Sequence, residues 1–129
     1  MQRNIRVLVV KPNELPKEEI IKNTLKAKQE IVGGNIELAY LENDDSVVLI
    51  CNEEGKIKEL PANRDIGYDI IVGNMIIAGD DSETGEFVSL TDSQIEKYKF
   101  RFDEQSIIDT NTKYTEIMIA KEKLKVYEI

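Results

Sequence analysis

The sequence predicts one α+β domain with a mostly antiparallel or mixed sheet and two helices. Three observations predict this class. Short apolar runs rich in β-branched residues recur along the chain, as is typical of strands. Two other segments carry helix-start signals and then apolar residues at helical spacing. The length of 129 residues and the apolar content of 41% match one domain with one core.

The first two strands are predicted near the N-terminus. Ile5–Val10 is apolar on both of its faces, so we expect a central strand that is covered on both sides. Pro12 and Pro16 bracket a turn. Glu18–Lys22 is then expected to form a short second strand.

The first helix is predicted over Thr24–Val32, with Asn23 as its N-cap and Gly33-Gly34 as its stop. Lys28 falls within the apolar arc of this helix. We expect its stem to lie along the edge of the core with the ammonium group in water. The alternative is a helix face that is only partly buried and open to a partner.

The middle of the chain predicts a run of strands. Asn35–Leu41 alternates and is expected to form a half-buried strand, followed by a turn at Glu42–Asp45. Val47–Cys51 is continuously apolar and is expected to form an inner strand. Asn52–Gly55 is typical of a tight reversal with a left-handed glycine, which leads to Lys56–Leu60 as in a hairpin.

The next segments alternate between loops and strands. Pro61–Gly67 is predicted as a loop, and Tyr68–Ala78 as strand with a break at Gly73-Asn74. Gly79–Glu86 is predicted as an acidic loop, and Phe87–Leu90 as a short strand.

The second helix is predicted to begin at a capping box, Thr91-Asp92-Ser93-Gln94, and to end near Phe102. Its buried stripe is expected to contain Ile95, Tyr98 and Phe102. The predicted organisation is therefore an α+β domain over residues 1–102 and a C-terminal extension over residues 103–129.

Two structures remain open for that extension. The first is a terminal hairpin of Thr115–Ala120 and Leu124–Ile129, packed on the same domain. The second is a helix through Ala120–Lys125.

The composition predicts a protein without enzymatic activity, cofactor or metal. The chain has no histidine, the commonest general base and metal ligand, and Cys51 is its one cysteine. We expect Cys51 to be buried and inert because it ends an apolar run. The apolar runs are shorter than the roughly 18 residues of a membrane span. The first residues do not resemble a signal peptide, and the single cysteine suits a reducing compartment, so a cytoplasmic location is expected.

The charge predicts a basic partner rather than nucleic acid. The net charge is −8, whereas a nucleic-acid binder must neutralise phosphates. Residues 29–96 carry three basic and sixteen acidic side chains. The alternative is a surface whose acids only keep the protein soluble. The predicted partner-binding residues lie in three loops and are Asp44, Asp45, Glu53, Glu54, Asp80, Asp81 and Glu83.

Asn63 and Arg64 are the candidate ligand-binding residues. An amide and a guanidinium after a proline turn are suited to a carboxylate or a phosphate. Equally, Arg64 could pair with Asp65 or Asp69 and fix the loop.

The chain resembles an uncharacterised bacterial family, domain of unknown function 3846, which is common in phages and mobile elements of Gram-positive bacteria. The resemblance covers about residues 5–102. It departs at Lys28, where the family places a larger apolar residue, and at Asn74-Met75, where the family has aromatic residues. It implies an accessory role and carries over no catalytic residue. The matching segments are IRVLVV at 5–10, NTLKA at 23–27, QEIVGG at 29–34, IE at 36–37, CNEEGK at 51–56, LPANR at 60–64, YDIIVG at 68–73, SLTD at 89–92 and QIEKY at 94–98.

Together these observations predict a non-enzymatic accessory protein of a phage or mobile element. We expect it to bind a host protein with a basic surface in the defence or nucleic-acid machinery, as an anti-restriction or anti-CRISPR protein does. The alternative is a protein that binds or sequesters a nucleotide signal, with Asn63 and Arg64 in its pocket. The sequence makes no prediction of oligomeric state.

Overall fold

The computed structural model describes residues 3–109 and 114–127 of the chain. Its main sheet has six strands in the order β2-β1-β7-β4-β3, with β8 paired to β7 beyond this path, and every strand pair is antiparallel. The α+β class is therefore confirmed. The strands of this sheet are β1 (Asn4–Val10), β2 (Lys17–Lys22), β3 (Ile36–Leu41), β4 (Asp44–Asn52), β7 (Met75–Asp80) and β8 (Phe87–Val88).

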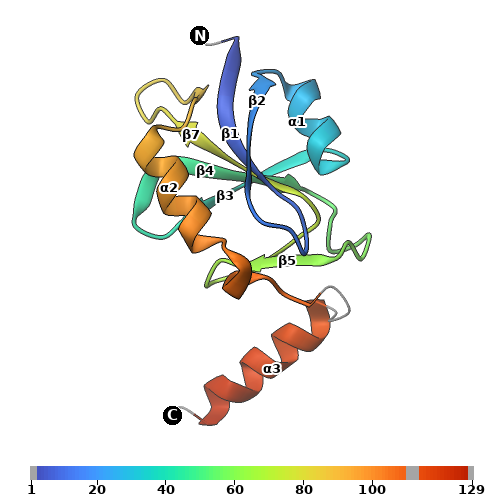
Figure 1. Ribbon diagram of the computed structural model, residues 1–129. Coiled ribbons are helices and arrows are strands. Elements are labelled where there is room, and N and C mark those ends of the chain that lie inside the picture. The colour runs from blue at the N-terminus through green and yellow to red at the C-terminus, as the bar shows by residue number, and fades with distance from the viewer. Residues whose placement is uncertain (1–2, 110–113, 128–129) are drawn as a thin grey trace.

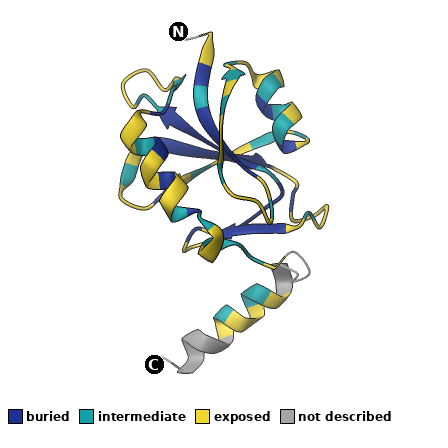
Figure 2. Ribbon diagram, viewed as in Figure 1, coloured by how far each residue is buried: buried dark blue, intermediate teal, exposed yellow. Residues whose placement is uncertain are grey.

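The main sheet is covered on both faces, as the apolar pattern of the first strand predicts. Helix α1 (Leu25–Val32) packs on one face, which it shares with Val7 of β1. Helix α2 (Asp92–Arg101) packs on the other face, together with Leu8 of β1. Figure 1 shows the two helices on opposite sides of the sheet, and Figure 2 shows the inner strands as the buried part of the molecule.

Helix α1 begins at Leu25, one residue later than predicted. Its N-cap is Thr24, whose hydroxyl accepts a hydrogen bond from the Ala27 N–H at 3.1 Å. Asn23 is not the cap: its side-chain oxygen accepts instead from Nζ of Lys28 at 2.8 Å, and its side-chain N–H donates to the carbonyl of Phe87 at 3.0 Å. The predicted stop is confirmed, since Gly33 has the left-handed φ of 83° that ends a helix.

The segment after β4 is not the predicted hairpin. Residues 53–59 form consecutive turns, and the left-handed residue is Glu59, with φ of 55°, rather than Gly55. Gly55 is buried instead, and a Cβ there would lie 2.8 Å from Cγ2 of Val72. The glycine is therefore needed for close packing and not for backbone freedom.

The predicted loop over Pro61–Gly67 contains a strand. β5 (Ala62–Asp65) pairs with β6 (Ile70–Val72) in a second, two-stranded sheet. Ile66 and Ile71 pack this sheet against the face of the main sheet that α2 covers. β5 was not predicted because three of its four residues are polar and therefore do not form an apolar run.

The C-terminal hairpin prediction is wrong, and the helix prediction is confirmed. α3 (Tyr114–Tyr127) follows a short 3₁₀ helix, η1 (Glu104–Ser106), and runs away from the sheet in Figure 1. Its Lys121 forms an ion pair of 2.8 Å with Asp65 and donates to the carbonyl of Gly67. None of the helices in the described ranges is both long and apolar enough to cross a membrane.

Candidate functional site

Asn63 and Arg64, the predicted ligand-binding residues, are both fully buried in β5. The Asn63 amide donates to the carbonyls of Val10 and Gly73, each at 2.8 Å. Its side-chain oxygen accepts from Nη1 of Arg64 at 2.8 Å. The hydrogen-bonding groups of both side chains are therefore engaged inside the protein, away from any external ligand.

Arg64 makes five hydrogen bonds, which equals the number of its N–H donors. Nε donates to the hydroxyl of Ser106 at 2.8 Å, and Nη2 donates to the carbonyls of Glu14 at 2.6 Å and Phe102 at 3.1 Å. Nη1 donates to the carbonyl and the side-chain oxygen of Asn63. Burial lowers the pKa of Arg64, and the negative charge of Asp103 acts in the opposite direction. Arg64 thus joins β5 to the turn at Glu14, to the end of α2 and to η1. The predicted pairing of Arg64 with Asp65 or Asp69 is not among its bonds.

Asp44, a predicted partner-binding residue, is instead part of the fold. Its side chain is only 12% exposed and accepts hydrogen bonds from Ser46, Lys97 and the hydroxyl of Tyr98. Burial acts to raise the pKa of Asp44, but these hydrogen bonds outweigh it and hold the pKa well below its usual value. The carboxylate therefore fastens the start of β4 to α2.

The other predicted partner-binding residues lie at both ends of β4. Asp45 is at its start, whereas Glu53 and Glu54 follow its end, so most of the length of the strand, roughly 25 Å, separates the two groups. The pairing of Val47 with Gly79 places Asp80, the last residue of β7, beside the start of β4. Asp81 and Glu83 follow in the loop from β7 to β8, which is shorter than predicted because β7 includes Gly79 and Asp80.

Nine carboxylates at and near the two ends of β4 form no ion pair within the described residues. All are exposed or half-buried. We call them the acidic surface. They belong to the β3–β4 hairpin with the turn after it and to the end of β7 with its following loop, and they are Glu37, Glu42, Asp45, Glu53, Glu54, Asp80, Asp81, Glu83 and Glu86.

Lys28 does not lie in water as the sequence suggested. The residue is 2% exposed, and its Nζ donates to the side chain of Asn23 at 2.8 Å and to the carbonyl of Thr24 at 3.3 Å. The ammonium group lies 4.6 Å from the ring centroid of Phe87, and burial lowers the pKa of Lys28. A hollow of about 240 Å³ opens beside it, between α1 and Phe87. The position of Lys28 within an apolar helical arc was the sequence signal for this burial.

Cys51 is buried, as predicted. Its thiol points to the carbonyl of Glu37 at 3.7 Å. Burial, with the nearby charges of Glu37 and Asp69, raises the pKa of Cys51 to about 11. Such a thiol carries almost no thiolate at neutral pH and is a poor nucleophile.

We therefore expect Cys51 to react slowly with a thiol reagent while the protein is folded. At about pH 8, only about a thousandth of the thiol is ionised, so labelling should be at least about 100-fold slower than at an exposed cysteine. The measurement is the rate of reaction with Ellman's reagent. The matched control is the double variant Cys51→Ser, Ser82→Cys, since Ser82 is exposed in the loop after β7. Equal rates in the two proteins would contradict the prediction.

The described residues contain no group of three or more acidic or cysteine side chains placed to hold a metal ion. In a comparison with known families, the family model for a domain of unknown function, DUF3846, matches residues 5–103. Comparison with curated proteins and with solved structures finds no match.

Proposed function

The chain belongs to the family of unknown function DUF3846, and from this premise we propose that it acts by binding another protein rather than by catalysis. The partner that we propose is a protein with a basic surface. The acidic surface is the part of the molecule that would meet it.

The observation that carries this proposal is the number of unpaired carboxylates on the acidic surface. Glu18 lies within 3.5 Å of Arg6 and 3.8 Å of Lys99, and Asp69 lies 2.6 Å from Lys56, whereas none of the nine acids of the acidic surface has such a basic neighbour within the described residues. Residues 29–55 contain seven acids and no lysine or arginine. The charge on the acidic surface is therefore left for a binding partner to neutralise.

Unpaired surface charge acts mainly on the rate of association. A concentrated field of one sign steers an oppositely charged surface into encounter and raises the association rate by about 10-fold to 1,000-fold. Salt screens this attraction beyond a Debye length of about 8 Å at physiological ionic strength. The same field repels phosphates, so the proposal names a protein partner and not a nucleic acid.

The biological setting that we propose is a phage or mobile element acting in the cytoplasm of its host. A basic surface is characteristic of proteins that handle nucleic acid, including the restriction and CRISPR machinery. An acidic protein that covers such a surface would block its use. This setting rests on the family resemblance and on charge.

The residues on which the nucleotide-binding alternative was based are not accessible to a ligand. Asn63 and Arg64 are buried, and their hydrogen-bonding groups are engaged within the protein. We therefore do not propose it.

Reversing the charge of Glu53 and Glu54 to lysine is expected to slow partner association by about tenfold without unfolding the protein. Both side chains are exposed, and neither takes part in a hydrogen bond or ion pair among the residues described. The test begins with affinity capture from a bacterial host lysate and identification of the retained protein. The association rate of that purified protein is then measured by surface plasmon resonance at rising salt.

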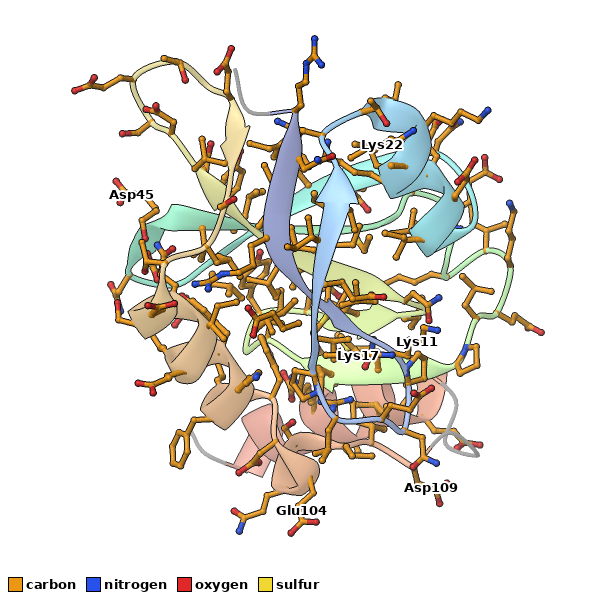
Figure 3. The ribbon with its side chains drawn as sticks, turned by 45° about the horizontal axis from the view of Figure 1, so that its top comes forward. Lys11, Lys17, Lys22, Asp45, Glu104 and Asp109 are labelled. Carbon is orange, nitrogen blue, oxygen red and sulfur yellow. The ribbon has the colours of Figure 1, made fainter. Side chains whose placement is uncertain are left out.

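The matched control reverses two acids elsewhere, Glu96 of α2 and Glu104 of η1, which are also exposed. Figure 3 labels Glu104 and Asp45 in separate regions of the molecule. We expect the control to associate at nearly the wild-type rate. An association rate indifferent to salt and to the Glu53, Glu54 reversal would show that the acids serve only solubility.

A further inference from the structure

β3 is an edge strand, and over Ile36–Ala39 its outward hydrogen-bonding groups have no partner among the described residues. The carbonyl of Asn35 accepts from the Glu53 N–H, so Asn35 faces β4. The direction alternates along a strand, and therefore Ile36 and Leu38 present their N–H and C=O groups outward. Tyr40 agrees with this alternation, because its carbonyl accepts from the Tyr68 hydroxyl at 2.7 Å. The open part of the edge is thus Ile36–Ala39.

The opposite edge of the sheet, β2, is protected against the addition of another strand, whereas β3 is not. β2 carries Lys17 and Lys22 at its two ends, and its Glu18 forms ion pairs with Arg6 and Lys99. Edge lysines are a common means of preventing a sheet from adding a foreign strand. β3 contains no basic residue at all. The two edges of one sheet are therefore built differently.

The side chains along β3 show which strand would fit beside it. Leu38 pairs with Ile50, so it lies on the face that α1 covers, yet it is 41% exposed. At the start of the strand, Ile36 lines a hollow with Leu25 of α1, which is 57% exposed. Glu37 pairs with Cys51 and so lies on the other face, where it lines a small hollow with Glu53. Asp69 and Lys56 line the same hollow and pair with each other at 2.6 Å, which leaves the carboxylates of Glu37 and Glu53 without a cation among the described residues. One face of the edge is apolar, and the other is acidic.

We propose that β3 binds an extended segment of the partner as an added antiparallel or parallel strand, in which apolar residues alternate with lysine or arginine. The apolar side chains would pack beside Leu38, and the basic side chains would lie near Glu37 and Glu53. This inference rests on the proposed function and adds its mode of recognition. Backbone hydrogen bonds supply affinity in strand addition, and the alternating side chains supply specificity. A second copy of β3 is a poor occupant, because it would bring its own Glu37 and Glu42 against the acidic surface.

The test uses a fluorescent peptide of four lysines alternating with three valines, and the variants Leu38→Pro and Ile20→Pro. Proline at position 38 removes an outward N–H and leaves the bonds to β4 in place, as proline does on edge strands. Ile20 is the matched position on β2: Asn23 donates to Arg3, which places the N–H of Ile20 outward as well. Ile20 is 73% exposed. Circular dichroism checks the fold of both variants.

We expect the peptide to bind the wild-type protein and Ile20→Pro alike, and to bind Leu38→Pro about tenfold more weakly. We also expect the amide protons of Ile36 and Leu38 to become protected from exchange when the peptide is bound. A peptide in which glutamate replaces lysine should not bind.

Three results would overturn the strand-addition proposal. The first is equal peptide affinity in the two proline variants, and the second is equal binding of the glutamate peptide. The third is a dimer of the chain that Leu38→Pro dissociates, since a second copy would then occupy the edge. If any of these occurs while reversal of Glu53 and Glu54 still slows partner association, the acidic surface remains the binding surface and strand addition is wrong.

Discussion

Replacing Arg64 with methionine is expected to lower the free energy of unfolding by about 3–5 kcal/mol, which is a large part of the stability of a domain of this size. Methionine fills much of the same volume but donates no hydrogen bond. The carbonyls of Glu14, Asn63 and Phe102 would then lose a donor in the interior, as would the hydroxyl of Ser106. Each buried acceptor left without a partner costs about 1–3 kcal/mol.

The charge of Arg64 is stabilised mainly by dipoles rather than by an ion pair in the described structure. One of these dipoles is the carbonyl of Phe102, at the C-terminal end of α2, where a helix carries partial negative charge. A neutral substitution therefore removes a cation from a site arranged for one. Lysine at this position would keep the charge but not the fork of five donors, so Arg64→Lys should also be strongly destabilising.

Urea unfolding followed by circular dichroism measures this effect. The matched control is Arg101→Ala. Arg101 lies at the same helix end, but its described contacts are weaker: one hydrogen bond of 3.5 Å to the carbonyl of Ile66 and a guanidinium 5.4 Å from the centroid of the Phe102 ring. We expect the control to lose less than about 1 kcal/mol. If Arg64→Met unfolds at the wild-type urea concentration, the hydrogen bonds of Arg64 contribute no net stability.

Replacing Asp44 with asparagine is expected to cost about 1–3 kcal/mol near neutral pH and to remove part of the loss of stability in acid. The pKa of Asp44 is lower in the folded protein than in the unfolded chain, where it is about 3.9. Its contribution is therefore fully present above that value. It is lost as the pH falls through the lower, folded-state pKa, because protonation then favours the unfolded chain.

The measurement is the free energy of unfolding as a function of pH, from about pH 7 to about pH 2. The matched control is Asp45→Asn, which changes the neighbouring carboxylate, one that is exposed and has no ion pair in the described part of the chain. We expect its curve to follow that of the wild-type protein. An unchanged acid slope in Asp44→Asn would contradict the assignment of Asp44 to the fold.

The sequence predicted the elements whose apolar pattern agrees with their place in the fold. β1 and β4 are apolar on both faces because both faces are covered, and the capping box at Thr91 forms as expected. β5 was not predicted, because its residue pattern does not agree with its buried place in the fold. Its Asn63 and Arg64 are buried polar residues whose partners come from distant parts of the chain, and no local pattern reports such partners.

The candidate sites show the same limit. Asp44 and Asp45 are adjacent and equally acidic in sequence, yet one is held by Tyr98 and Lys97 and the other is exposed. The difference is set by α2, more than fifty residues away. Charge counting found the acidic stretch, but only the fold separates the acids that build the structure from those left at its surface.

The bonds of Arg64 also determine where the folding unit ends. The family match stops at residue 103, whereas the Nε of Arg64 is satisfied by Ser106 in η1. A chain truncated at residue 103 would keep the bonds to Glu14, Asn63 and Phe102 and leave the Nε–H buried without an acceptor. We therefore expect the minimal autonomous domain to include η1, because the segment beyond the family match supplies an acceptor to a buried side chain.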